Sequence, residues 1–155
     1  MRKLIILIMA VMLVSLTSCG DFKEITVNSV AVHNVSLDGL KAVDIELFVE
    51  IDNPASRLTL SDMEATVKHS GKVLGKVTVD PFTLERKKVQ VYDLKARMAL
   101  QLKVHELYLL MDPEVITNSV VDITVKGTIR GGLSKTVTRN DVPLKKLLEY
   151  AENKK

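Results

Sequence analysis

Apolar and polar residues alternate along much of the chain, and the clearest alternation runs from Val43 to Asp52. A period of two is the pattern of a β-strand with one buried face, because successive side chains point to opposite sides of the backbone. The apolar set is Val43, Ile45, Leu47, Val49 and Ile51, and the acidic set is Asp44, Glu46, Glu50 and Asp52. The segment is therefore predicted to be a half-buried strand whose acidic side chains face solvent.

Turn residues divide the rest of the chain into further strands. One or two N-terminal strands are predicted from Ile25, Val27, Val30 and Val32, with Asp38-Gly39 turning into the long strand. Two hairpins are predicted where a glycine allows a tight turn with positive φ. The first joins Leu58–Lys68 to Lys72–Val79 through Ser70-Gly71, and the second joins the Val121–Val125 strand to Leu133–Thr138 through Gly131-Gly132.

A long strand region is predicted from Lys88 to Val104. Its apolar phase slips between Val91 and Leu94, and a β-bulge near Tyr92-Asp93 would restore the phase. The residues that then face inward are Leu94, Ala96, Met98, Leu100 and Leu102. We therefore expect a bulged strand here.

Two helices are expected to interrupt the strands. Apolar residues follow helical spacing between His105 and Asn118, with Asp112-Pro113-Glu114 resembling an N-cap. A second stripe follows at Leu144, Leu147, Leu148 and Ala151 and is expected to pack over the domain. Pro54, Pro81, Pro113 and Pro143 fall between the proposed strands, where a missing N–H breaks no ladder. The pattern predicts a mainly β, antiparallel β-sandwich of about seven strands, with one inserted helix and a short C-terminal helix.

The first eighteen residues differ from the rest in being almost entirely apolar. Arg2 and Lys3 precede an apolar run from Leu4 to Leu16, which is shorter than the about 20 residues that a spanning helix needs. A basic start, an apolar centre and small residues before a cut site are typical of an export signal. An ordinary cleaved signal and an uncleaved anchor remain alternatives.

Leu16-Thr17-Ser18-Cys19 resembles the lipobox of bacterial lipoproteins, and Cys19 is the only cysteine in the chain. The resemblance implies cleavage between Ser18 and Cys19 and acylation of Cys19. Two or three acyl chains would hold the protein on a membrane almost irreversibly. Because Gly20 rather than Asp follows the cysteine, an outer membrane is favoured if the organism has one. The expected division is a signal peptide at 1–18, a lipidated tether at 19–24, a β-sandwich at 25–143, and a C-terminal helix and tail at 144–155.

Charge and length limit what the remaining residues can do. Removing residues 1–18 leaves about 137 residues, which is the size of one domain. Basic and acidic side chains are then almost equal in number, so we expect no nucleic-acid partner. Arg86-Lys87-Lys88 and Lys145-Lys146 could touch anionic headgroups, but solvated edges of the fold explain them more simply. Oligomeric state is not specified.

No pattern of catalytic or metal-binding residues is present in the sequence. His33, His69 and His105 are widely separated and lack the spacing that would place two metal ligands on one face. No nucleophile elbow, phosphate loop or calcium loop occurs. Once Cys19 is acylated, no free thiol remains for catalysis. We therefore expect a protein that is not an enzyme, with no metal and no cofactor.

The order of these elements resembles a known family. A long strand that ends in Asp52-Asn53-Pro54, a hairpin with Gly71 and Gly75, an aliphatic strand, a short helix and the run Val121 to Gly127 are similar to the water-stress and hypersensitive-response domain. That domain belongs to the second subgroup of late embryogenesis abundant proteins. The resemblance covers roughly Ile25 to Val142. It implies a sandwich of the immunoglobulin or fibronectin type III kind, and an association with stress tolerance and membranes.

The resulting expectation is a lipid-anchored, non-enzymatic module of the cell envelope that binds another envelope protein or has a structural role. Loops opposite the tether are the expected contact sites, with Asn53, Pro54, Gly131 and Gly132 as candidates. The alternative is a lipoprotein that binds or transfers a lipid or another apolar ligand, because the strands are aliphatic and a helix could cover a cavity.

Overall fold

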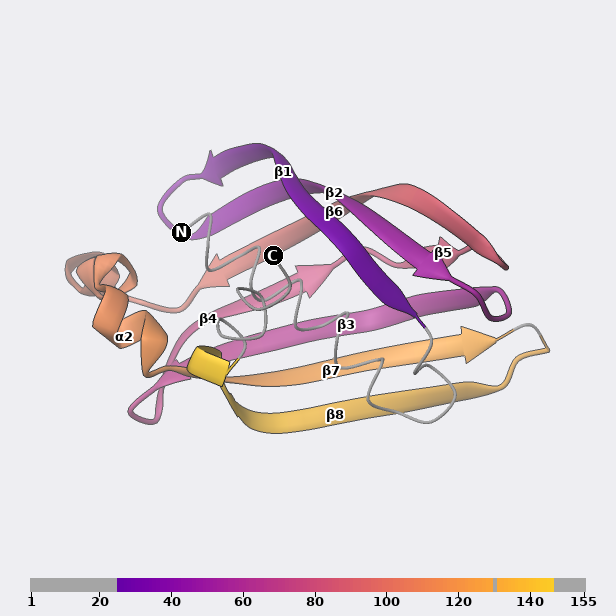
Figure 1. Cartoon of the computed structure of the whole chain (residues 1–155). Helices are drawn as coiled ribbons and strands as arrows, with labels where there is room; N and C mark the ends of the chain where they lie inside the picture. The colour runs from indigo at the N-terminus through magenta and orange to yellow at the C-terminus, as the bar shows by residue number, and fades with distance from the viewer. Residues whose placement is uncertain (1–24, 130, 147–155) are drawn as a thin grey trace.

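The computed structural model describes residues 25–129 and 131–146, most of which form antiparallel strands. The strands are β1 (Thr26–Asp38), β2 (Ala42–Asn53), β3 (Leu58–His69), β4 (Lys72–Val79), β5 (Phe82–Leu84), β6 (Lys88–Leu100), β7 (Val120–Ile129) and β8 (Ser134–Pro143). A 3₁₀ helix, η2 (Val104–Met111), and a short α-helix, α2 (Pro113–Thr117), connect β6 to β7 at one end of the domain (Figure 1).

The strands form one continuous sheet in the order β1-β2-β6-β4-β3-β7-β8, and β5 pairs with β3. The prediction of a mainly β, antiparallel fold is confirmed. The three-residue strand β5 was not predicted, and it brings the number of strands to eight. β6 pairs with β2 along its whole length and with β4 through its last five residues. The two halves of the sheet are thus joined by hydrogen bonds, although their side chains face each other across one core.

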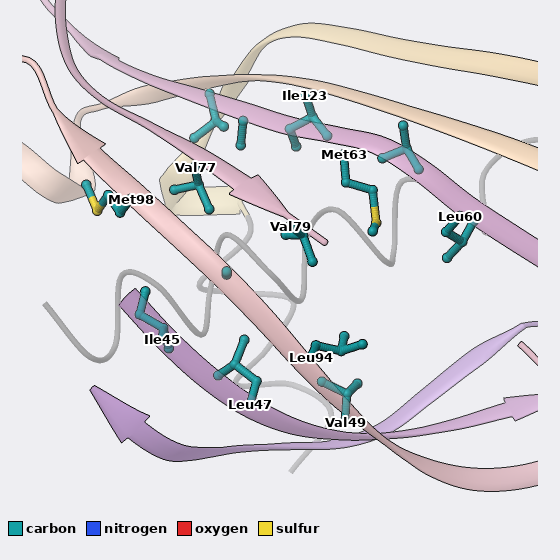
Figure 2. Close-up of a cluster of buried hydrophobic side chains, with 14 of the residues drawn as sticks. Ile45, Leu47, Val49, Leu60, Met63, Val77, Val79, Leu94, Met98 and Ile123 are labelled. Carbon is teal, nitrogen blue, oxygen red and sulfur yellow. The ribbon is translucent and has the colours of Figure 1, made fainter. Parts of the chain in front are cut away.

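Aliphatic side chains from both halves of the sheet fill that core (Figure 2). Ile45, Leu47 and Val49 of β2 point toward Val77 and Val79 of β4. All five are buried. Burying each such side chain contributes about 1.5–3 kcal/mol relative to leaving it in water. The predicted inward face of β2 is therefore the centre of the core, and its acidic residues lie on the outer face.

Gly75 lets β4 approach β6 closely. A Cβ at this position would lie 2.9 Å from Cε of Met98 and 3.1 Å from the carbonyl oxygen of Ala99. Because Gly75 pairs with Leu100 where the two halves of the sheet join, a side chain here would push apart the strands that connect them. The glycine in the predicted hairpin thus has a packing role.

The predicted bulge in β6 is wrong. β6 pairs with β2 without any register shift from Ala42–Ala99 to Asn53–Lys88. Tyr92 faces inward, and its hydroxyl accepts a hydrogen bond from the backbone N–H of Glu85 at 2.9 Å. Val89 and Val91 instead face outward and are more than half exposed. The apparent phase slip therefore arises from apolar residues on the solvent face rather than from an extra residue.

Register shifts occur in other strand pairs instead, and two of them lie in β1. Its pairing with β2 shifts between Val27 and Ser29 and again between Val32 and Asn34. Each shift inserts one residue and changes which side chains face the core. This explains why the apolar pattern of this segment suggested one or two strands, where the structure has a single strand.

The predicted hairpins are present. Ser70 and Gly71 both have positive φ, at 49° and 78°, in the turn between β3 and β4. Gly131 and Gly132, at 106° and 84°, lie between β7 and β8. Pro143 departs from expectation because it is the last residue of β8 and is opposite Val120. Proline has no N–H to donate to a neighbouring strand. Among the described residues β8 has no strand on its other side, so Pro143 leaves no ladder incomplete.

The predicted helix between His105 and Asn118 is divided into η2 and α2. Asp112 is the N-cap of α2, and its carboxylate accepts a hydrogen bond from the N–H of Glu114 at 2.9 Å, as predicted. At the C-terminus, residues 144–146 begin a helical turn and Leu144 is fully buried. The remaining residues of that stripe, Leu147, Leu148 and Ala151, lie outside the described residues. Across 25–129 and 131–146, no helix is long and apolar enough to cross a membrane.

Candidate functional site

A pocket of about 350 Å³ lies at the end of the domain where β2 turns into β3 and β7 turns into β8. One wall comes from the β2–β3 connection and the first residue of β3, and the other comes from β7 and the β7–β8 hairpin. The lining residues are Ile25, Asn53, Ala55, Ser56, Leu58, Gly127, Ile129, Leu133, Ser134 and Lys135. The lining is mostly apolar, and Lys135 is the charged side chain among its described residues.

Asn53 fixes the shape of the β2–β3 connection. Its side chain is fully buried, and its amide donates hydrogen bonds of 3.0 Å to the carbonyl oxygens of Ser56 and Glu85. Its amide oxygen accepts a hydrogen bond from the N–H of Ala55 at 3.1 Å. One side chain therefore closes the turn and ties it to the chain after β5. The Asn53-Pro54 pair is a structural corner, and Asn53 has no free polar group to offer a partner.

The β7–β8 hairpin forms the opposite wall. The N–H of Ile129 donates to the carbonyl oxygen of Leu133 at 2.9 Å, and the N–H of Gly132 donates to that of Ile129 at 3.2 Å. Leu133 is 71% exposed although it lines the pocket. The hairpin thus holds a large apolar side chain at the rim, in contact with solvent.

The two predicted contact loops therefore lie on either side of one pocket. Pro54 follows Asn53 in one wall, and Gly131 and Gly132 form the turn of the other. The loops do not lie opposite the tether, however, because Ile25 lines the same pocket and is the first described residue after the tether. The expectation that they face away from the chain entry is wrong. Binding by these loops stays a prediction. The predicted cleavage and acylation site, Ser18 and Cys19, lies outside the described residues.

Sequence reasoning missed the apolar residues that make these loops into a pocket. Ile25 and Leu58 were assigned only to strands, and Ile129 lay beyond the predicted Val121–Val125 strand. Leu133 and Lys135 were both assigned to the last strand. Lys135 does lie in β8, but β8 begins at Ser134, so Leu133 belongs to the turn. An apolar residue directly after Gly131-Gly132 was the available signal, since turns usually carry polar residues.

The histidines remain apart from the pocket. His33 packs against Phe48 on the outer face, with ring centroids 4.6 Å apart. His69 ends β3, and His105 lies in η2. In the part of the chain that the structure describes, no group of three His, Cys, Asp or Glu side chains is arranged to hold a metal ion.

The shifted pKa values also arise elsewhere, from ion pairs on the surface. A hydrogen bond from Lys68 lowers the pKa of Asp122, and the same contact raises the pKa of Lys68. The nitrogen of Lys68 lies 2.7 Å from Asp122 and 3.0 Å from Asp141. Structural ion pairs perturb titration without implying catalysis. These groups tie β3, β7 and β8 together on the outer face.

Two further ion pairs act at the other end of the domain. Lys72 lowers the pKa of Glu106 through a hydrogen bond, which links the β3–β4 turn to η2. Asp38 and Asp44 raise the pKa of Arg97, with Asp38 the larger cause. Both contacts join neighbouring segments and are partly exposed.

Comparison with known families agrees with this architecture. A family model described as late embryogenesis abundant protein matches residues 48–146. The chain belongs to this family. The match begins within β2 and extends through β8, so this late embryogenesis abundant domain includes both walls of the pocket.

Two solved structures are similar to the domain only at low identity. A crystal structure of a protein from Archaeoglobus fulgidus is 14% identical, with a TM-score of 0.44, and covers 74% of this chain and 93% of that one. The GAE domain of yeast GGA1 is 8% identical, with a TM-score of 0.30, and covers 76% of this chain and 97% of that one. No curated protein matches the chain.

Replacing Asn53 with alanine is expected to destabilise the domain by about 2–4 kcal/mol. The change removes three hydrogen bonds and leaves the carbonyls of Ser56 and Glu85 without their buried donor. The free energy of unfolding of the full chain measures the effect. Asn28→Ala is the matched control, because Asn28 is exposed and makes one side-chain bond, to Glu50. Equal stability of the two variants would contradict the structural role of Asn53.

Proposed function

We propose that this late embryogenesis abundant domain is a lipid-anchored, non-enzymatic module of the bacterial cell envelope. In this proposal Cys19 carries the anchor and the pocket end of the domain meets the partner. The supporting observation is that Ile25, only six residues after Cys19, lines the pocket. The following Gly20 favours the outer membrane where one exists. We also propose a role in stress tolerance, because the chain belongs to the late embryogenesis abundant family.

The tether would determine where the pocket can work. Six residues span at most about 20 Å when fully extended, so a lipid on Cys19 would hold the pocket near the membrane surface. Confinement to this thin layer raises the effective concentration of the domain toward neighbouring components into the millimolar range. Weak contacts with another envelope protein, made by the rim around Pro54 and Gly132, would then suffice.

The non-enzymatic part of the proposal depends on what the chain offers for chemistry. Acylation of Cys19 would consume the single thiol, and no motif in the sequence supplies a nucleophile together with a base. The four perturbed pKa values have exposed ion pairs as their cause. A binding or structural role accounts for the domain without a reaction. The partner would be an envelope protein, and no nucleic acid is expected.

Acylation can be measured by metabolic labelling with an acyl-chain analogue in the native host or a close relative. We expect label on the natural protein in the membrane fraction and none on Cys19→Ser. A Ser18→Ala variant should keep the label, because a small residue before the cysteine is retained. Equal labelling of the natural protein and Cys19→Ser, or no labelling of either, would contradict the lipid anchor.

A second candidate function is the binding of an apolar ligand, and the pocket itself favours it. Its volume of about 350 Å³ lies at the lower end of the range for small-molecule sites, and most of its lining is apolar. Lys135 stands beside this lining and could pair with an anionic headgroup. A single acyl chain with an acidic end fits this chemistry. Placement near the membrane would give the pocket access to such molecules.

Filling the pocket tests this second function. Ser56 lines the pocket and contributes only its backbone carbonyl to the Asn53 network, so Ser56→Phe should occupy the space and leave the turn intact. With a photoactivatable fatty acid in intact membranes, we expect crosslinks at residues 53–58 and 129–135. These should fall several-fold in Ser56→Phe.

The control for this experiment is Ser61→Phe, on the outer face of β3. It adds the same aromatic ring away from the pocket and should crosslink like the natural protein. Crosslinks that are unchanged in Ser56→Phe, or spread evenly over the domain, would contradict apolar-ligand binding in the pocket.

A further inference from the structure

The end of the domain away from the pocket exposes five large apolar side chains. Leu37 lies near the end of β1, Leu40 lies in the turn between β1 and β2, and Val104, Tyr108 and Met111 lie on η2. Their exposed fractions range from 63% for Leu40 to 83% for Met111. We name these five residues the distal apolar end. Large apolar side chains exposed at one end of a domain can mark a site of contact with proteins or membranes.

Both segments belong to the same end of the fold (Figure 1). The N–H of Leu100 donates to the carbonyl oxygen of Lys41 at 2.7 Å, which joins the β1–β2 turn to the end of β6. η2 begins four residues later, and Lys72 pairs with Glu106 within it. The turn and η2 are thus held by the β6 terminus and the β3–β4 turn.

η2 carries apolar side chains toward the core and also on part of its outer surface. Leu107 and Leu110 pack against the core. Val104, Tyr108 and Met111 follow at i, i+4 and i+7 and are exposed. The apolar stripe of a helix normally packs against a neighbour. The outer side of η2 therefore lacks a neighbour among the described residues.

Two lysines at the distal apolar end are available to meet an anionic lipid surface. Lys41 directly follows Leu40 and Lys103 directly precedes Val104, and neither forms an ion pair within the described residues. The acidic groups nearby are largely neutralised, because Asp38 pairs with Arg97 and Glu106 pairs with Lys72. Asp112 caps α2, and Glu114 lies in its first turn. Unpaired lysines beside apolar tips can reach phosphate while their stems stay in contact with apolar groups.

The shape of the surface and its residue types agree with this choice. The five side chains protrude from a turn and a helix, so a soft bilayer interface can receive them without a pocket of matching shape. Tyrosine is enriched at membrane interfaces because its ring is apolar and its hydroxyl is polar. Tyr108 would have this position. A protein partner would instead need a surface shaped to both segments.

The strand that connects the two ends carries no charged side chain before its last residue, Asp38. From Thr26 to Leu37, β1 contains no Asp, Glu, Lys or Arg. Its 13 residues separate the pocket end from the distal apolar end by about 40 Å. By comparison, β8 at the other end of the strand order carries Lys135, Arg139 and Asp141. β1 itself therefore places no formal charge against a headgroup layer between Thr26 and Leu37, and the acidic side chains on the outer face lie one strand further in, on β2.

We infer that the distal apolar end docks on the interface of an anionic phospholipid bilayer, so that the domain lies along the membrane on its β1 side. This rests on the proposed lipid anchor, which holds the other end. Two contacts, the acyl chains before Ile25 and the side chains around Tyr108, would define the orientation. The pocket would then open beside the membrane rather than away from it.

The chain contains no tryptophan, so one introduced tryptophan is a unique reporter. The full lipidated chain with Tyr108→Trp is reconstituted in vesicles of phosphatidylcholine and phosphatidylglycerol, with or without bromine on the acyl chains. Brominated lipid is expected to quench roughly half or more of its emission, because the indole would lie within the interface. Met111→Trp is a second reporter and should behave alike. Thr78→Trp, at an exposed position of β4 three strands from β1, should be unquenched.

The outcomes separate this inference from the proposed function. Protein that floats with the vesicles but shows no quenching in either the Tyr108→Trp or the Met111→Trp variant would overturn the docking and leave the distal apolar end as a surface for a protein. Protein that does not float would overturn the anchor and the docking together. Quenching that persists in vesicles of phosphatidylcholine alone would overturn the role of Lys41 and Lys103.

Discussion

The pairing of β6 with both β2 and β4 is the constraint on which the rest of this domain depends. β6 carries the core residues Leu94, Ala96 and Met98 on one face, and its two edges join the halves of the sheet. The close approach at Gly75 makes the second junction possible. Because β2 pairs with β6 along twelve consecutive positions, its inward aliphatic residues are held opposite those of β4. The hydrogen bonds between β2 and β6 and the burial of the aliphatic side chains of β2 and β4 thus favour the same arrangement of the two halves of the sheet.

This arrangement also gives the domain two different ends. At one end, the buried Asn53 closes the β2–β3 corner, and the β7–β8 hairpin faces it across an apolar pocket that Ile25 also lines. At the other end, the β1–β2 turn and η2 expose aliphatic and aromatic side chains beside unpaired lysines. A lipid on Cys19 would place the first end at the membrane, and the second end has the chemistry to reach the same surface. The proposed function therefore depends on how the domain is placed at the membrane more than on any reactive group.

The sequence predicted most of the sheet because alternation and turn chemistry act locally. The strand at Val43–Asp52, the Ser70-Gly71 hairpin and the Asp112 cap follow from such local rules. It failed where tertiary context decides. Val89 and Val91 lie on a solvent face that their apolar character does not reveal, so a bulge was placed in β6 instead of β1. Likewise, Asn53 and Gly131 were recognised as turn residues, but no pattern in the chain shows that distant strands bring them to one pocket. Their position at the chain entry is a property of the strand order alone.

The central claim is that the domain works while held to a membrane through Cys19. The intact mass of the natural protein, purified from membranes of its host or a near relative, tests it most directly. The account predicts a chain that begins at Cys19, with a mass increased by two or three acyl groups and their glyceryl link. A mass that matches the unmodified chain, either complete or cleaved elsewhere, would contradict the lipid anchor and the orientation inferred from it.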